Sequence, residues 1–372
     1  MIRIGIIGCG KIADQHAVQI RRIPGAEIAA VCDSEPLMAR QMAERWNIKG
    51  SYTDSRQMLE TSKLDVVHIT TPPQSHFELG RLCLEAGTHV YIEKPFTLNV
   101  ADAEALIGLA ARMGLKLTAG HNAQFTHAMV RMRDLVAGGY LGGKPVHLES
   151  TYCYSLGDES YAKAMLGDTG HWVRALPGSL LQNIISHGIS KIAEFLEGDE
   201  PLVMAHGFTS PMLTRIGQGD ITDEVRVIIQ GDGATTAYFT FSSQIGPTQH
   251  QFRIYGPRNS LIVDDDHQTL IKVRNDTYKS YLRYFVPPLE YAGQYIRNFG
   301  LNVGGFVRGN FHLPFDSGLK TLIESFYSSI EGGGPLPISY REILLTTRIM
   351  DRIFEQVASN RVPGTIAQDR GN

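Results

Sequence analysis

The chain has 372 residues, which is enough for two domains with buried cores, and its apolar content of 43% is ordinary for a globular protein. The net charge is −3 and there are no basic blocks, which argues against nucleic acid or an anionic membrane surface as a partner. No apolar run approaches the roughly 18 residues that cross a bilayer. The start of the sequence does not resemble a secretion signal, and the four widely spaced cysteines predict reduced thiols, so a cytoplasmic location is expected.

Residues 2–33 carry the clearest pattern in the chain. The apolar run Ile2–Ile7 predicts a buried strand, and Gly8-Cys9-Gly10-Lys11-Ile12-Ala13 follows it directly. An amphipathic helix, a second apolar run over 27–32 and Asp33 complete the segment. Strand, G-x-G-x-x-A turn, helix, strand and acidic residue in this order are the fingerprint of a dinucleotide-binding domain.

Each part of this fingerprint has a physical role. Gly8 allows the sharp turn off the strand, and Gly10 lacks the Cβ that would keep a pyrophosphate away from the backbone. The first helical residues, Lys11 and Ile12, carry backbone N–H groups at the positive end of the helix dipole, where phosphates bind. Asp33 would accept hydrogen bonds from ribose hydroxyls and repel a 2′-phosphate, which favours NAD over NADP.

After Asp33, helices and strands alternate as they do in a doubly wound parallel sheet with helices on both faces. Ser75 and Glu78 have the spacing of a capping box, and Asn99 is an expected helix cap. The pattern ends near His121, so residues 1–121 are predicted to form a Rossmann domain that binds NAD. The helices are expected over 36–46, 54–61, 75–86 and 99–113, and the strands over 65–70, 88–92 and 116–120.

Residues 122–372 show a different pattern, in which apolar and polar residues alternate with period two, as is typical of antiparallel strands. They are predicted to form an α+β domain with a large, mostly antiparallel open sheet that binds substrate and mediates oligomerisation. Residues 275–315 show no clear period. Ser339 and Glu342 form a second capping-box pattern. The strands are expected over 145–154, 202–208, 224–230, 235–243, 249–255 and 261–263, and the helices over 127–137, 179–195, 318–330 and from 339 onward.

Ligands of doubly wound sheets bind outside the carboxyl ends of the strands. Three segments of the first domain lie there beside the glycine turn: Thr70-Thr71-Pro72-Pro73, Glu93-Lys94-Pro95 and Gly120-His121-Asn122. The ammonium of Lys94 could stabilise an alkoxide or relay a proton during hydride transfer. The alternative is a surface lysine paired with Glu93.

In the second domain, Asn183 and His187 are four residues apart on a predicted helix and therefore share one face, which Lys191 continues. An unperturbed imidazole titrates near neutral pH, so His187 could act as a general base toward a substrate hydroxyl. A lone histidine on a helix is more often structural, and both roles stay open.

The chain resembles the glucose–fructose oxidoreductase / inositol dehydrogenase / MocA (Gfo/Idh/MocA) family over almost its whole length. The resemblance depends on the glycine turn, Asp33, Thr71-Pro72 with His76, and above all the Glu-Lys-Pro at 93–95, and it continues at 120–125 and 172–174. It implies an NAD(P)-dependent dehydrogenase or reductase acting on the CH–OH group of a sugar, cyclitol or nucleotide sugar. It also implies Lys94 and His187 as the catalytic pair assisted by Asn183, a cis Lys94–Pro95 bond, and a homodimer or homotetramer formed through the second sheet. No segment of the sequence has the spacing of metal ligands, so no metal is expected. The cofactor-binding residues implied by the motifs are Gly8, Gly10, Lys11, Ile12, Asp33, Thr71, Pro72, His76, Glu93, Lys94, Asn122 and Trp172.

Two positions depart from the family pattern. Asn183 stands where the family usually has an aspartate, and Ser190 stands where an acidic residue often follows the histidine. An amide cannot raise an imidazole pKa as a carboxylate does, so His187 should be less basic than its counterparts and Lys94 should handle more of the proton transfer. The sequence does not predict which substrate reacts or in which direction. It also does not predict whether the protein recognises a nucleotide moiety of the substrate.

Two other functions fit the same fold: a non-catalytic NAD-binding sensor, and a glycoside hydrolase that retains its NAD. Three further features have an ordinary interpretation beside the functional one. His76 is either a solvated turn residue or a neighbour of the cofactor, and Trp172 is either a packing residue or part of the cleft. The run Asp264-Asp265-Asp266 looks like a metal cluster but reads better as a solvated turn.

Overall fold

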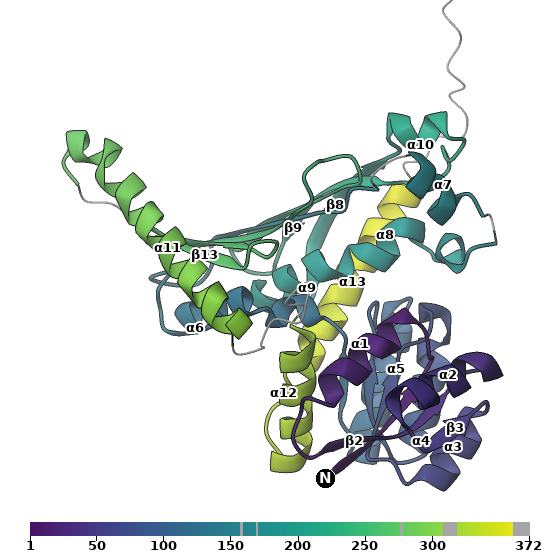
Figure 1. The fold of residues 1–372 in the computed structure, drawn as a ribbon. Coiled ribbons are helices and arrows are strands. Elements are labelled where there is room, and N and C mark those ends of the chain that lie inside the picture. Colours follow the sequence, from purple (N-terminus) through teal and green to yellow (C-terminus); the bar gives the residue numbers. More distant parts are fainter. Residues whose placement is uncertain (157–158, 169, 276–277, 308–317, 360–372) are drawn as a thin grey trace, which may run out of the picture.

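The computed structural model describes residues 1–156, 159–168, 170–275, 278–307 and 318–359. Two β-sheets organise these residues, one of six strands and one of seven (Figure 1). The long helix α13, Tyr340–Ser359, runs from one layer to the other, while α11, Val286–Val307, extends away from the rest of the molecule (Figure 1). The predicted fold class, a Rossmann-like parallel sheet followed by a mostly antiparallel one, is confirmed.

The first sheet is parallel and has the order β3-β2-β1-β4-β5-β6, which is the Rossmann order. Its strands are β1 Ile2–Ile7, β2 Ala26–Cys32, β3 Gly50–Tyr52, β4 Val66–Ile69, β5 His89–Ile92 and β6 Leu117–Ala119. Its helices are α1 Lys11–Ile20, α2 Pro36–Trp46, α3 Ser55–Ser62, α4 His76–Glu85 and α5 Val100–Met113. The strand β3 was not predicted from the sequence, because three residues that include a glycine show no recognisable period.

The two predicted caps of the first domain have different outcomes. Asn99 accepts a hydrogen bond from the backbone N–H of Asp102 at 2.8 Å, as expected for the N-cap of α5. The capping box at Ser75 is wrong. Ser75 already has helical backbone angles as the last residue of a 3₁₀ turn, and its hydroxyl donates to Pro72 O and Thr71 Oγ1 instead.

The first hydrophobic core is closed by a helix from the far end of the chain. Leu322, Ile323 and Phe326 of α12, Leu319–Gly332, are buried in the same cluster as Ile4 and Ile6 of the central strand. The division of the chain at residue 121 stays a prediction, but residues 1–121 do not complete their own core.

The second sheet has the order β13-β12-β11-β7-β10-β9-β8 and is antiparallel except where β7 pairs with β10. Its strands are β7 His147–Cys153, β8 Leu202–Phe208, β9 Glu224–Gln230, β10 Thr236–Ser242, β11 Gln249–Tyr255, β12 Asn259–Asp264 and β13 Thr269–Arg274. The helices around it are α6 His127–Ala137, α7 Glu159–Leu166, α8 Ser179–Ile184, α9 Ser186–Phe195 and α10 Pro211–Arg215. The helix predicted over 179–195 is therefore two helices that meet at Ile185, and β13 was not predicted.

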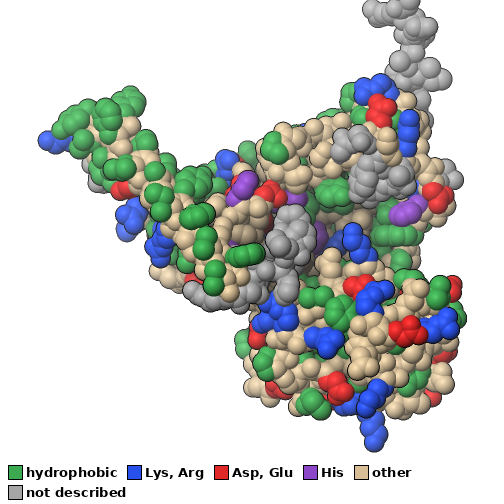
Figure 2. Space-filling model, in the orientation of Figure 1, with side chains coloured by type: hydrophobic (Ala, Val, Ile, Leu, Met, Phe, Trp, Pro, Cys, Tyr) green, Lys and Arg blue, Asp and Glu red, His purple; other side chains and the backbone are tan. Residues whose placement is uncertain are grey.

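The stretch 275–315, in which no period was found, contains the 22-residue helix α11. Its apolar residues do not form a single buried stripe, and many of them are exposed, among them Leu289, Ile296 and Phe299. Hydrophobic side chains accordingly cover much of the arm that α11 forms (Figure 2). Residues 308–315 lie outside the described part of the chain. The last capping box is confirmed, since Ser339 and Glu342 exchange side-chain-to-backbone hydrogen bonds ahead of α13.

Candidate functional site

The glycine turn between β1 and α1 has the backbone that the fingerprint requires. Gly8 has φ +93°, and a Cβ there would lie 2.8 Å from the backbone nitrogen of Thr71. Gly10 is different, because a Cβ at this residue would meet no heavy atom within 4 Å. Gly8 is thus required by the fold itself, whereas the space beside Gly10 is left open by the protein, which fits a phosphate approaching the backbone.

Replacing Gly8 with alanine should lower the free energy of unfolding by about 3 kcal/mol, because it adds a steric clash to a strained φ. Gly25→Ala is the matched control. Gly25 has φ +79° but an open Cβ direction, so this variant should lose only about 1 kcal/mol. The measurement is urea-induced unfolding of both variants, and equal losses would show that the contact with Thr71 is not important.

Asp33 holds the glycine turn in place, in addition to the ribose contact predicted for it. Its Oδ2 accepts a hydrogen bond from the backbone N–H of Cys9 at 2.7 Å, and its Oδ1 accepts from the N–H of Glu35 at 2.9 Å. One carboxylate therefore fixes the glycine turn against the end of β2. This second role follows from the fold and could not be seen in the spacing of the motif.

Lys94 lies at the carboxyl end of β5 and points toward the second domain. Its Nζ donates to the backbone carbonyl oxygen of Asn183 at 2.9 Å and lies 3.4 Å from Asn183 Oδ1. The Lys94–Pro95 bond is cis, as the family resemblance implied. Burial lowers the pKa of the Lys94 ammonium, and the nearby charge of Glu93 offsets part of this effect. The alternative interpretation of Lys94 as a surface lysine is wrong.

Glu93 turns away from the Lys94 ammonium and into the first core. Its Oε1 lies 2.9 Å from His16 Nε2, and its Oε2 accepts a hydrogen bond from the backbone N–H of Lys94 at 3.0 Å. Burial raises the pKa of this carboxyl group, but the contact with His16 and the charge of Lys94 outweigh burial, so the pKa lies below its ordinary value. Glu93 is therefore ionised and holds the backbone that carries Lys94.

His16 belongs to a buried chain of hydrogen bonds that ends at Tyr327 of α12. His16 Nδ1 lies 2.8 Å from His68 Nδ1, and His68 Nε2 lies 2.8 Å from the Tyr327 hydroxyl. Burial and the neighbouring His16 lower the pKa of His68 far below its ordinary value, so His68 is neutral. Because ionised Glu93 can only accept, His16 Nε2 carries a proton.

Two proton arrangements satisfy this chain. With neutral His16, Tyr327 donates to His68, His68 donates to His16, and His16 donates to Glu93. With protonated His16, the bonds between His16, His68 and Tyr327 reverse their direction. In both arrangements every link keeps one donor and one acceptor. The roles of His16, His68 and Tyr327 were not predicted from the sequence, because 259 positions separate the last two and no motif joins them.

His187 lies in the first turn of α9, packed against β7 and β11. Its ring stacks on Tyr152, with centroids 5.5 Å apart, and Tyr152 in turn contacts His250. Burial lowers the pKa of His187 well below its ordinary value, and the charges of Lys94, then of His121, Lys191 and His250, add to the effect. Among the described residues, the buried Nδ1 of His187 has no hydrogen-bond partner.

Asn183 and His187 were expected to share one face of a single helix, but the structure places them on two helices. The break at Ile185 places these two residues on different helices, and the described contacts join Asn183 to Lys94 rather than to His187. The Lys94 ammonium of the first domain therefore lies against the end of α8, just before α9, which carries His187, and its charge acts on the imidazole. The low basicity expected of His187 agrees with the direction of its pKa.

The interpretation of Asp264-Asp265-Asp266 as a solvated turn is wrong for two of the three residues. Asp265 forms an ion pair with buried Lys191, and Asp266 Oδ1 lies 2.7 Å from His250 Nδ1. This turn therefore anchors the side chains that surround His187. Among the described residues, no group of three or more His, Cys, Asp or Glu side chains could hold a metal ion.

Residues 2–121 match the family model described as "Oxidoreductase family, NAD-binding Rossmann fold". Myo-inositol 2-dehydrogenase of Thermotoga maritima is 25% identical over 77% of this chain and 83% of its own length. D-apiose dehydrogenase of Paraburkholderia graminis is 34% identical over 37% of this chain and 36% of its own length. The structure of an NAD binding oxidoreductase from Klebsiella pneumoniae superimposes with a TM-score of 0.76, covering 97% of each chain at 22% identity.

Over residues 2–121 the chain is similar to the NAD-binding Rossmann domain of the Gfo/Idh/MocA oxidoreductase family. Over almost the whole chain the fold is the one found in this solved structure. The match to D-apiose dehydrogenase, which exceeds 30% identity, covers only about a third of each chain. None of the described helices is long and apolar enough to cross a membrane.

Two further residues predicted from the family motifs are placed by this structure. His76 is fully buried rather than solvated, and its ring nitrogens lie 2.9 Å from the carbonyl oxygens of Thr71 and Pro95. It therefore ties the loop after β4 to the loop that carries Lys94. The backbone oxygen of Trp172 accepts a hydrogen bond from Gln74 at 3.0 Å, so this residue of the second domain lies against the loop after β4.

The remaining predicted cofactor residues follow the same edge of the sheet. Lys11 is exposed and Ile12 half-buried at the start of α1, Pro72 is exposed, and Asn122 opens the 3₁₀ turn after β6. All of them follow strands whose carboxyl ends share one edge. Contact of each residue with a cofactor stays a prediction.

Proposed function

We propose that the protein is an NAD-dependent oxidoreductase that moves a hydride between the nicotinamide ring and a secondary alcohol or ketone of a sugar or cyclitol. The observation that carries this proposal is the contact of the Lys94 ammonium with Asn183, which precedes His187 by four residues in the chain. It brings a cation and an imidazole from different domains to the cofactor edge of the first sheet. The dehydrogenase names of the relatives support the substrate class.

Bound NAD would supply the hydride acceptor, and the protein would supply charge and proton transfer. Oxidation of an alcohol releases one hydride and one proton, and the hydroxyl oxygen carries negative charge as the hydride leaves. Lys94 would stabilise this charge through its ammonium. His187, neutral because its pKa is lowered, would take the proton.

Asp33 supports NAD as the preferred cofactor. Its carboxylate lies at the end of β2, fixed by the N–H groups of Cys9 and Glu35. A 2′-phosphate near this carboxylate would be repelled, whereas ribose hydroxyls can donate to its remaining lone pairs.

The direct test is a screen of sugars, cyclitols and nucleotide sugars for NADH formation, run in parallel with NADP. The proposal expects turnover with at least one class of polyol and a preference for NAD of about tenfold or more, since charge repulsion at this position is worth at least about 1.4 kcal/mol. Tight NAD binding without turnover would favour the sensor. Hydrolysis of a glycoside without net NADH would favour the NAD-retaining hydrolase.

The second sheet supports a homodimer or homotetramer as the working form. Met204, Ile228 and Tyr238 are exposed on its outer face, which α9 does not cover. A second copy of this face would cover these side chains. The four free, buried cysteines fit a reducing compartment such as the cytoplasm.

A pH profile tests the link between Glu93 and Lys94. The charge of Glu93 raises the pKa of Lys94, so Glu93→Gln should lower that pKa further. The high-pH limb of the kcat profile, which reports Lys94, should therefore move to lower pH. The amide keeps the shape of the side chain and can still accept from His16. An unchanged limb would mean that Lys94 does not titrate in this profile.

A further inference from the structure

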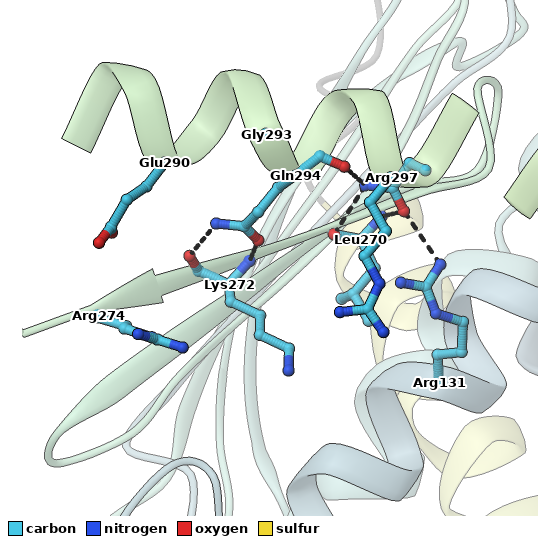
Figure 3. Close-up of a pocket in the computed structure, with 9 residues that line it drawn as sticks. Arg131, Leu270, Lys272, Arg274, Glu290, Gly293, Gln294 and Arg297 are labelled. Atoms are coloured by element: carbon cyan, nitrogen blue, oxygen red, sulfur yellow. Dashed lines mark hydrogen bonds between the residues drawn. The ribbon is translucent and has the colours of Figure 1, made fainter. Parts of the chain in front are cut away.

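A pocket of about 280 Å³ lies between α6, β13 and α11, and it shares no lining residue with the candidate active site (Figure 3). Four cationic side chains line it: Arg131 from α6, Lys272 and Arg274 from β13, and Arg297 from α11. Leu270, Glu290, Gly293, Gln294 and Asn298 complete the lining. This concentration of positive charge is unusual in a chain whose net charge is −3.

Two amide side chains of α11 fix the walls of the pocket. Gln294 accepts from the backbone N–H of Lys272 at 2.7 Å and donates to its carbonyl oxygen at 3.0 Å. Asn298, one turn further on, forms the same pair of bonds with Leu270 at 3.2 and 3.1 Å. The helix thus satisfies the free edge of β13 as a neighbouring strand would. The cations of these elements are consequently held at a defined spacing (Figure 3).

Arg131 is held by the same amide side chain that binds β13. Its Nη1 donates to Asn298 Oδ1 at 3.0 Å, and Asn298 itself is only 1% exposed. On the other side, the Lys272 ammonium lies 5.5 Å from the centroid of the Tyr140 ring. These contacts orient two of the cations without neutralising either.

The positive charge has no matching carboxylate among the described residues. Glu290 is the one acidic side chain of the lining, and it accepts a hydrogen bond from the Tyr278 hydroxyl at 2.6 Å. No described carboxylate lies within 4.0 Å of a charged nitrogen of the four cations. Burial, and then the neighbouring Arg297, lowers the pKa of Arg131. Burial, and then Arg297, Arg274 and Arg131, lowers that of Lys272.

We propose that this pocket is a binding site for a phosphate-type polyanion, with a diphosphate group as its best match. Four cations and one carboxylate leave a net charge of +3, which would roughly balance the negative charge of a diphosphate near neutral pH. Guanidinium groups bind phosphate oxygens in pairs, and three of the four cations are arginines. The volume suits a small ligand or the phosphate portion of a larger one. The site is independent of the function proposed above.

Titration calorimetry with inorganic phosphate, inorganic pyrophosphate and uridine diphosphate tests this proposal. NAD is kept in excess in each titration, so that the glycine turn does not compete for the probe. Pyrophosphate should bind more tightly than phosphate. Lys272→Gln and Arg297→Gln should each weaken pyrophosphate binding about tenfold, and the double variant should weaken it further. Binding should also weaken as salt is raised.

Lys279→Gln is the matched control, because it removes an exposed charge close to α11 that does not line the pocket. It should leave the dissociation constant within about twofold, since exposed charges contribute little. Equal affinity for uridine diphosphate and pyrophosphate would identify the bare diphosphate as the ligand, and tighter binding of uridine diphosphate would identify a nucleotide. Absence of pyrophosphate binding, or equal affinity in the wild type and the double variant, would overturn the proposal.

Discussion

Replacing Lys94 with alanine is expected to lower kcat by about a thousandfold or more, while NAD binds with nearly unchanged affinity. The ammonium stabilises charge that develops only as the hydride moves, so its loss affects the transition state far more than cofactor binding. The measurement combines steady-state NADH formation, on a substrate found by the screen, with NAD titration followed by tryptophan fluorescence. Full activity in this variant would make the catalytic assignment wrong.

Two further variants separate the charge of Lys94 from its shape. Lys94→Met keeps most of the volume and should be as inactive as the alanine variant, whereas Lys94→Arg keeps the charge and should retain more activity. Lys144→Ala is the matched control, because this lysine is exposed and pairs with Glu197 far from the cofactor edge. It should be fully active. If Lys94→Ala loses activity and also has a lower melting temperature, the loss could come from unfolding. The activity of Lys94→Met at an unchanged melting temperature then shows whether the charge itself is required.

Replacing His187 with glutamine is expected to lower kcat by about a hundredfold, since general base catalysis typically contributes this much or more. The amide fills most of the volume next to Tyr152 but cannot take up a proton. His187→Ala should lower kcat similarly and also destabilise the fold by creating a cavity. His206→Gln removes an exposed histidine of β8 and should leave kcat unchanged.

The pH dependence of the wild type checks the same residue. Because the pKa of His187 is lowered well below its ordinary value, kcat should not fall as pH decreases through the imidazole range near 6.5. Any fall that His187 causes should come at lower pH, where the imidazole gains its proton and can no longer act as a base. A fall near the ordinary value would mean that His187 is solvated in the working enzyme or that another group acts.

The short-range signals of the first domain were sufficient to predict its fold. A strand, a glycine turn and a helix are adjacent in the chain, so Gly8, Gly10 and Asp33 could be assigned from spacing alone. Lys94 was also found because it directly follows a strand and precedes a proline. Errors arose where two local signals competed. Ser75 matches a capping box, yet the preceding prolines start a 3₁₀ turn that already includes it.

In the second domain the sequence patterns were weaker, and two features near His187 were not predicted correctly. These are the helix break at Ile185 and the contacts of Asp265 and Asp266. The apolar pattern over 179–195 continues through Ile185, so nothing in it indicates that α8 ends there. The helix α11 has apolar residues on several sides and contacts the sheet mainly through the amides of Gln294 and Asn298. A periodicity argument cannot identify a helix that is joined to its neighbour in this way.

The sequence by itself determined the parallel sheet, the dinucleotide turn and the identity of Lys94 and His187 as candidate residues, since each depends on residues close together in the chain. Only the tertiary structure decided which groups surround them. Glu93 meets His16 across 77 positions, and Lys191 meets Asp265 across 74. Such pairs form only where two elements that are distant in the sequence pack together in the folded chain. No local pattern records these distances.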